Sequence, residues 1–208
     1  MPAHQNTKRR HHHVWQHYLK PWTKNGAIWC QQDNKIFSTG TTTVAIENDF
    51  YKVAELSISQ IEYLKLIFTM KDDKELTKIH YDFIDKIQAP FQFIKKINAP
   101  LEKTGSVLKH YSSNVLEDYH ASIENSFSQH LKDALNKNIK FYLTDESCIT
   151  FINYICTQYM RTKGIKERAI QANAAANLPD LAPMWNMMIH MFAINIGKSL
   201  FTERKSEN

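Results

Sequence analysis

The sequence contains few of the residues that interrupt regular structure. Its 208 residues include only five glycines and six prolines, too few for the frequent tight turns of an all-β protein or for a linker-rich chain. Hydrophobic residues make up 43% of the chain, enough to bury one substantial core. We therefore expect a single domain over residues 11–208, preceded by a disordered basic arm at 1–10.

Cysteine is also scarce, with three residues and no C-x-x-C pair. This excludes a disulfide framework and a structural zinc site, and it suits a reducing compartment such as the cytoplasm. The polar N-terminus lacks the apolar core of a signal peptide. The most apolar window, Met184–Phe201, contains several residues that are costly in lipid, so we expect no membrane segment there; these residues are Asn186, His190, Asn195 and Lys198.

Several motifs of well-known enzyme classes are absent from the sequence. It has no glycine-rich phosphate loop, no G-x-S-x-G elbow and no H-E-x-x-H pair, and P-loop hydrolysis, dinucleotide binding and esterase chemistry are disfavoured. The formal net charge of +5 is compatible with a nucleic-acid partner but does not require one.

The pattern along the chain predicts a mainly α protein with a small N-terminal antiparallel β meander packed on a multi-helix bundle. Residues 11–54 hold a histidine motif and short β-branched runs separated by turn residues. Residues 55–208 show helical periodicity. We expect helices near 57–71, 73–90, 112–136, 144–172 and 184–200, with a loop at 98–105 and Pro90 ending or kinking the second helix.

The first candidate site is the segment from Arg10 to Trp22, which holds four of the ten histidines. Imidazole transfers protons near neutral pH and binds metals. A catalytic histidine and a structural one are both consistent with this pattern.

The second candidate lies on the helix expected at 112–136. Glu117, His120 and Glu124 are spaced i, i+3 and i+7 and so project from one helical face. Such a set could ligate a divalent metal, magnesium or manganese, or hold a general base. A hydrated acidic face is the alternative explanation.

The third candidate is Gln158 and Arg161, which share a helical face, with Arg168 two turns further on. The planar guanidinium of arginine binds phosphates and carboxylates through two hydrogen bonds. The alternative is a buried Arg161 that pairs with Glu117 or Glu124 and joins two helices.

Several of these segments also follow a known family pattern. The opening at His12, with Val14, Gln16, Tyr18, Leu19 and Lys20, resembles the "H-x-V-P-Q-x-Y-L-[KR]-x-F" start of the domain of unknown function 4238 family, although Trp15 replaces the proline. Similar matches are Gly26–Trp29, Glu47–Tyr51, Glu117–Asp118, Ile123–Glu124 and the "F-I-x-x-Q-x-x-R-T" segment ending at Thr162. We expect the C-terminal part of the family to be missing from this chain.

The resemblance maps the site positions without supplying a reaction. It implies that a set of polar residues converges in one cleft: His12, Gln16, Glu117, Glu124, Gln158 and Arg161. In a metal-dependent nuclease the carboxylates would hold the metal, His12 would activate water and Arg161 would stabilise the phosphate charge. The family setting suggests a bacterial defence or toxin protein.

A second hypothesis comes from another functional class. The polar residues would form a buried network in a non-catalytic interaction module, and the methionine-rich helix Met184–Phe201 would bind a protein partner or a second copy of the chain.

Overall fold

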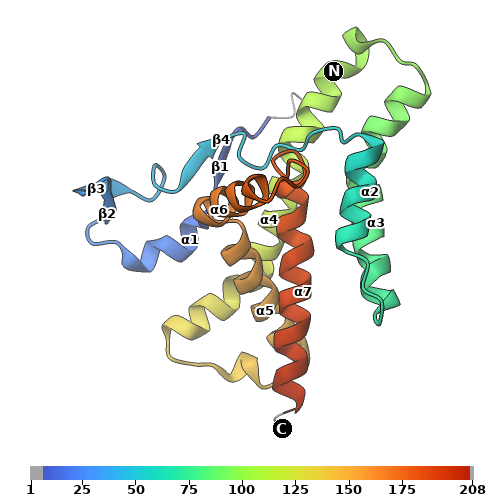
Figure 1. The fold of residues 1–208 in the computed structure, drawn as a ribbon. Coiled ribbons are helices and arrows are strands. Elements are labelled where there is room, and N and C mark those ends of the chain that lie inside the picture. The colour runs from blue at the N-terminus through green and yellow to red at the C-terminus, as the bar shows by residue number, and fades with distance from the viewer. Residues whose placement is uncertain (1–6, 207–208) are drawn as a thin grey trace.

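The computed structural model describes residues 7–206, and it confirms a mainly α fold with strands confined to the N-terminal region (Figure 1). The elements in chain order are β1 (Arg10–His12), α1 (Gln16–Leu19), the 3-10 helix η1 (Lys20–Trp22), β2 (Ala27–Gln32), β3 (Lys35–Gly40), β4 (Ile46–Asn48), α2 (Ile58–Ile67), α3 (Lys74–Lys96), α4 (Leu101–Leu135), the 3-10 helix η2 (Lys140–Tyr142), α5 (Asp145–Met160), α6 (Lys163–Ala175) and α7 (Trp185–Ser206).

The strands form two separate antiparallel pairs instead of the single meander expected from the sequence. β2 and β3 form a hairpin whose two-residue turn, Asp33 and Asn34, has φ values of 48° and 62°; two positive values are typical of a type I′ turn. β4 pairs with β1, with His12 opposite Ile46. The turn that precedes β4 ends at Ala45, at a φ of 54°, and directs the chain away from β3.

The predicted basic arm falls partly outside the described residues, which begin at Thr7. Its described end forms ion pairs with residues elsewhere in the chain. The Lys8 ammonium lies 2.6 Å from a carboxylate oxygen of Asp118 on α4. The Arg9 guanidinium lies 2.7 Å from Asp49, and the next residue begins β1.

Helix starts were predicted best where a polar side chain caps the helix. Ser57 and Gln60 form a reciprocal capping box at the start of α2. Asp73 caps α3 by accepting a hydrogen bond from the backbone N–H of Leu76 at 3.0 Å.

The structure places two helix boundaries differently from the sequence prediction. α4 begins at Leu101 instead of near residue 112 and passes through Gly105, because Leu108 and Tyr111 pack against the core and so favour the helical conformation. The helix expected at 144–172 is two helices, since the backbone of Thr162 is extended (φ −69°, ψ 143°) and separates α5 from α6.

Pro90 does not end α3, which continues to Lys96. A proline has no N–H for the carbonyl four residues earlier, here that of Lys86. The hydroxyl of Tyr111 on α4 reaches this turn: it lies 3.5 Å from the Lys86 carbonyl oxygen and donates to the Ile87 carbonyl at 3.1 Å. Tyr111 therefore stabilises the turn that the proline weakens.

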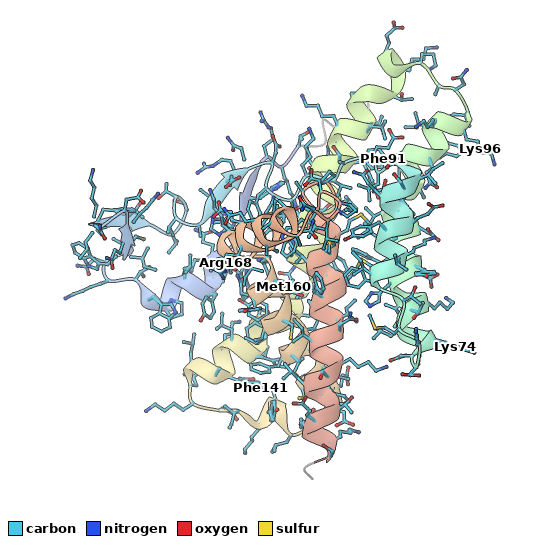
Figure 2. The ribbon with its side chains drawn as sticks, in the orientation of Figure 1. Lys74, Phe91, Lys96, Phe141, Met160 and Arg168 are labelled. Atoms are coloured by element: carbon cyan, nitrogen blue, oxygen red, sulfur yellow. The ribbon has the colours of Figure 1, made fainter. Side chains whose placement is uncertain are left out.

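α5 and α7 run antiparallel through the middle of the molecule (Figure 1). Asp145 at the start of α5 accordingly forms an ion pair with Arg204 near the end of α7. The helices approach closely at Gly197, where an added Cβ would lie 3.2 Å from a methyl carbon of Ile152. Side chains crowd around the labelled Met160, whereas Lys74 and Lys96 at the two ends of α3 point outward (Figure 2). None of the helices within residues 7–206 has the length and hydropathy needed to cross a membrane.

The methionine-rich start of α7, together with Met184 just before it, belongs to this core. Met184, Met187, Met188 and Met191 are each at most 1% exposed. The adaptable thioether side chains fill the space between helices. Any partner contact of α7 has to use its more exposed C-terminal half.

We predict that Tyr111→Phe lowers the free energy of unfolding by about 1 kcal/mol, because the part-buried hydrogen bond of its hydroxyl to the turn at Lys86 and Ile87 is lost. The loss should shrink in a Pro90→Ala background, in which the alanine restores a backbone N–H for the Lys86 carbonyl. Urea denaturation of the four proteins of this double-mutant cycle measures the coupling. Equal losses in both backgrounds would contradict the proposed compensation.

Candidate functional site: a buried polar cluster

Polar side chains from four parts of the chain meet beneath β1. We call them the polar cluster: Tyr51, Glu117, His120, Glu124, Arg161 and His190. Tyr51 follows β4, the next three residues lie on α4, Arg161 is the C-terminal cap of α5, and His190 lies on α7. The cluster therefore joins the N-terminal strands to three helices.

Arg161 is the central residue of the polar cluster. Its side chain is 3% exposed, and its Nη2 atom lies 2.6 Å from the Oε1 atom of Glu124, whose side chain is 16% exposed. The same nitrogen donates to the carbonyl oxygen of His12 at 3.3 Å. Arginine stays protonated in proteins, so this buried charge requires a nearby carboxylate and acceptor.

Burial raises the pKa of both carboxyls, and the charge of Arg161 opposes the rise. Glu124 is in direct contact with the guanidinium. For Glu117 burial dominates and, with the neighbouring charge of Glu124 adding to it, raises the pKa to about 7. The polar cluster thus holds one arginine, one paired carboxylate and one carboxyl that titrates near neutrality.

The rings of the cluster contact one another in a row and are tilted by 42° and 41° between neighbours. Tyr51 lies 4.2 Å from His120 between ring centroids, and His120 lies 4.6 Å from His190. The Arg161 guanidinium lies 5.8 Å from the centroid of Tyr51. Burial lowers the pKa of His120 well below its ordinary value and that of His190 to about 3. Both imidazoles are therefore neutral at physiological pH.

The histidine-rich opening contributes mainly through its backbone. The Tyr51 hydroxyl donates to the His12 carbonyl at 3.2 Å, the acceptor that Arg161 also uses. The imidazole of His12 is not part of the polar cluster, and burial lowers its pKa. The predicted role of His12 as a water-activating base therefore has no support in this geometry.

Both ring nitrogens of His11 have hydrogen-bond partners. Its Nδ1 atom accepts the backbone N–H of Tyr51 at 2.9 Å, and its Nε2 atom lies 3.0 Å from the carbonyl oxygen of Lys8. An acceptor at Nδ1 and a donor at Nε2 define one neutral tautomer. Burial lowers the pKa of His11, in agreement with this state. It is a structural histidine.

The two predicted glutamines bind backbone and hydroxyl groups. Gln158 accepts from the backbone N–H of Trp15 and donates to the carbonyl of His13, both at 3.1 Å. Gln16 donates to the Thr41 hydroxyl at 3.1 Å. Trp15 itself is buried against the rings of Phe127 and Tyr154. These contacts attach the N-terminal motif to α4 and α5.

The structure brings together four of the predicted site residues, namely Glu117, His120, Glu124 and Arg161. Sequence reasoning missed two members of the polar cluster. Tyr51 had a signal, because it lies in the matched Glu47–Tyr51 segment. His190 had none beyond being a polar residue on an apolar helix.

The predicted metal triad Glu117, His120 and Glu124 is not assembled as a ligand set. In the part of the chain that the structure describes, no group of three or more histidine, cysteine or acidic side chains could hold a metal ion. Glu124 faces Arg161 instead, and His120 is sandwiched between Tyr51 and His190.

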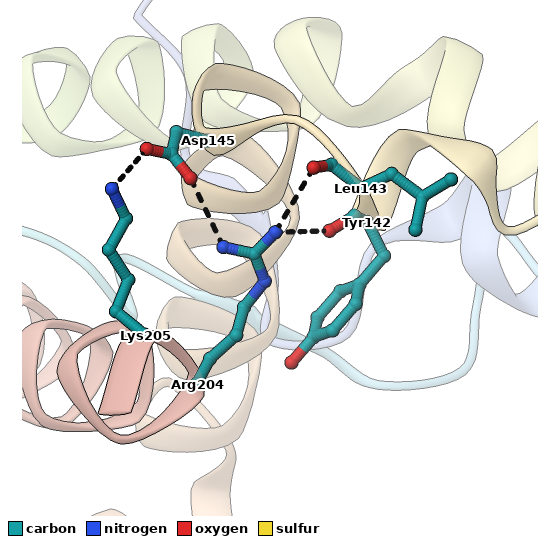
Figure 3. Close-up of a pocket in the computed structure, with 5 residues that line it drawn as sticks. All are labelled: Tyr142, Leu143, Asp145, Arg204 and Lys205. Carbon is teal, nitrogen blue, oxygen red and sulfur yellow. Dashed lines mark hydrogen bonds and ion pairs between the residues drawn. The ribbon is translucent and has the colours of Figure 1, made fainter. Parts of the chain in front are cut away.

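The main surface cavities also lie away from the polar cluster. One cavity, of about 420 Å³, lies at the end of α7 (Figure 3). There the Arg204 guanidinium donates to the Asp145 carboxylate at 3.1 Å. It also donates to the carbonyl oxygens of Tyr142 and Leu143, at 2.9 and 3.2 Å. These bonds fasten α7 to the segment before α5. A larger groove of about 490 Å³ is mostly apolar and is lined by Ile79, Tyr119, Ile149, Ile194, Phe201 and neighbouring residues.

The chain was compared with known proteins. No curated protein and no solved structure matches it. A family model described as "Protein of unknown function (DUF4238)" matches residues 10–182. This range includes β1, Tyr51, the carboxylates of α4 and Arg161, and thus all of the polar cluster except His190. The match extends over most of the chain, which therefore belongs to the DUF4238 family.

Proposed function

We propose that this chain is a non-catalytic binding module whose polar cluster holds the N-terminal motif on the helices. The main support for this proposal is that the Arg161–Glu124 ion pair is buried. Arg161 and Glu124 are 3% and 16% exposed and are engaged with each other. A phosphate group would have to displace Glu124 and reach a buried guanidinium, which costs several kcal/mol.

The hydrogen bonds of the matched residues support the same proposal. Arg161 and Tyr51 share the carbonyl of His12, and Gln158 satisfies the backbone on either side of Val14. Side chains that form hydrogen bonds with backbone N–H and carbonyl groups hold that part of the chain in place, whereas a catalytic side chain has to lie within reach of the substrate.

A second candidate is the metal-dependent nuclease of a bacterial defence or toxin system. Two observations favour it. The pKa of Glu117 is raised to about 7, and such shifts are common at catalytic sites. Within residues 7–206, the Nε atom of Arg161 and both ring nitrogens of His120 are buried without a hydrogen-bond partner. This candidate requires the polar cluster to open and admit Mg²⁺ or Mn²⁺ with the substrate.

Substitutions of the ion pair distinguish the two functions. We expect Glu124→Ala to lower the free energy of unfolding by about 3–5 kcal/mol, because it leaves the Arg161 charge buried and unpaired. The double variant Glu124→Leu/Arg161→Met should recover most of this loss, since it removes both charges. Urea denaturation of the wild type, the single variant and the double variant measures their free energies of unfolding.

The same proteins should be incubated with single- and double-stranded DNA and RNA in Mg²⁺ or Mn²⁺. The binding-module proposal expects no cleavage by the wild type. Cleavage that Glu124→Ala abolishes while its stability stays that of the wild type would overturn the proposal and support the nuclease.

The titration of Glu117 gives a separate prediction. Its folded-state pKa of about 7 exceeds the ordinary 4.5, so the folded chain binds more protons between these values. Its contribution to stability is present in full below pH 4.5 and is lost as the pH rises through about 7.

Glu117→Gln removes this titration and keeps the shape of the side chain. The stability of this variant relative to wild type should therefore increase between about pH 5 and pH 8, by on the order of 1–3 kcal/mol. The buried histidines affect both proteins equally and cancel in the difference. A parallel curve for Glu117→Gln would show that Glu117 is not buried as described.

A further inference from the structure

The hairpin of β2 and β3 stands apart from the rest of the molecule. Together with η1 it forms what we call the wing, residues 20–40. In Figure 1 the hairpin lies at the left edge of the view, away from the helices. β2 and β3 pair with each other, and within residues 7–206 neither makes an extended contact with a helix. An isolated two-stranded hairpin is only marginally stable in water, so its exposed position needs an explanation.

The wing exposes large apolar side chains. Trp22 and Trp29 are 68% and 69% exposed, and Ile36 and Phe37 are exposed as well. The register sets which of them share a face. Trp29 is paired with Ser38 and lies on the same face as Ile36, whereas Phe37 points to the opposite face because side chains alternate along a strand. Both faces of the ribbon therefore carry apolar groups.

The charges of the wing are almost all positive. Residues 20–40 contain Lys20, Lys24 and Lys35, with Asp33 as the only acidic residue. In the described part of the chain none of these lysines is ion-paired with a carboxylate. By contrast, Lys8 and Arg9 of the basic arm face Asp118 and Asp49. The lysines of the wing thus remain available to an anionic ligand.

From this combination we infer that the wing binds single-stranded nucleic acid. Unpaired bases stack on exposed aromatic rings, and lysines neutralise the phosphates that run beside them. A duplex keeps its base faces covered and cannot use Trp22 and Trp29 in this way. Gln31 and Ser38 share the face of Trp29 and supply polar groups for base edges.

The geometry fits this occupant better than a membrane surface. Insertion into a lipid interface needs one continuous apolar face with the polar groups on the other. Here Trp29 and Phe37 lie on opposite faces, and glutamine and serine separate the apolar side chains. A strand of nucleotides can follow a ribbon edge and contact rings on either side.

Fluorescence anisotropy with the full chain tests the inference. The probes are labelled oligo(dT) and oligo(U) of about 15 nucleotides and a duplex of the same length, at about 50 mM salt. We expect the single strands to bind more tightly than the duplex. Trp29→Ala should weaken single-strand binding by about 5- to 100-fold, as expected for the loss of one stacking ring. Lys24→Glu/Lys35→Glu should weaken it and reduce its salt dependence.

Matched controls lie on α3 or directly before it. Phe93→Ala removes an aromatic ring that is 60% exposed, and Lys71→Glu/Lys96→Glu makes the same change in net charge as the wing variant. Both should bind like wild type. Thermal unfolding by circular dichroism should show that all variants remain folded, because the substituted side chains are exposed.

Three results would overturn the inference. Equal binding by Trp29→Ala and wild type would exclude stacking at this ring. Equal affinity for single strands and duplex would indicate only general attraction to phosphate. Binding to phosphatidylserine vesicles without binding to either oligonucleotide would make the wing a membrane contact. The inference goes beyond the proposed function, and none of these results depends on the stability of the polar cluster.

Discussion

The charge of Arg161 is the constraint around which the structure is organised. A guanidinium cannot lose its proton at physiological pH, so its burial is tolerated only where acceptors surround it. Glu124 supplies the opposite charge from α4, and the carbonyl of His12 supplies an acceptor from β1. The end of α5, the middle of α4 and the first strand must therefore occur together. Loss of Glu124 or of Arg161 would leave the other charge uncompensated, and loss of β1 would remove the second acceptor of the guanidinium.

This constraint explains the form of the histidine-rich opening. The group of this segment that Arg161 and Tyr51 bind is the backbone carbonyl of His12, and Gln158 binds the backbone on either side of Val14. His11 adds a tautomer-specific link to Tyr51. A segment held by its backbone keeps a fixed path whatever its outward side chains are. The histidines therefore mark a segment that is docked on the helices through its backbone.

The sequence predicted those features that depend on local chemistry. Ser57 and Asp73 cap their helices, and the apolar periodicity defines the helical faces. The alternative in which Arg161 pairs with Glu124 is the one that the structure shows. The boundaries at Leu101 and Thr162 were missed because packing of α4 against the core and a single extended residue determine them.

The sequence predicted several residues of the polar cluster but not how they are arranged. Spacing on α4 placed Glu117, His120 and Glu124 on one side, but their partners come from distant segments. Only the fold puts Tyr51 and His190 against His120. Spacing along one helix cannot reveal whether a carboxylate faces a metal ion or an arginine on another helix. Sequence reasoning therefore left the buried ion pair as one of two alternatives, and only the fold decides between them.

The pairing of β1 with β4 has a consequence for how the chain can vary. Because His12 lies opposite Ile46, the segment between them leaves and returns to the body at adjacent points. A loop with fixed ends gains or loses residues at a small entropic cost, about 0.6 kcal/mol for each doubling of length. Trp15 and Gln16 secure its first turn, so insertions and deletions beyond them leave the helical body intact. The far end of this segment can thus change in length while the helical body that carries it keeps its structure.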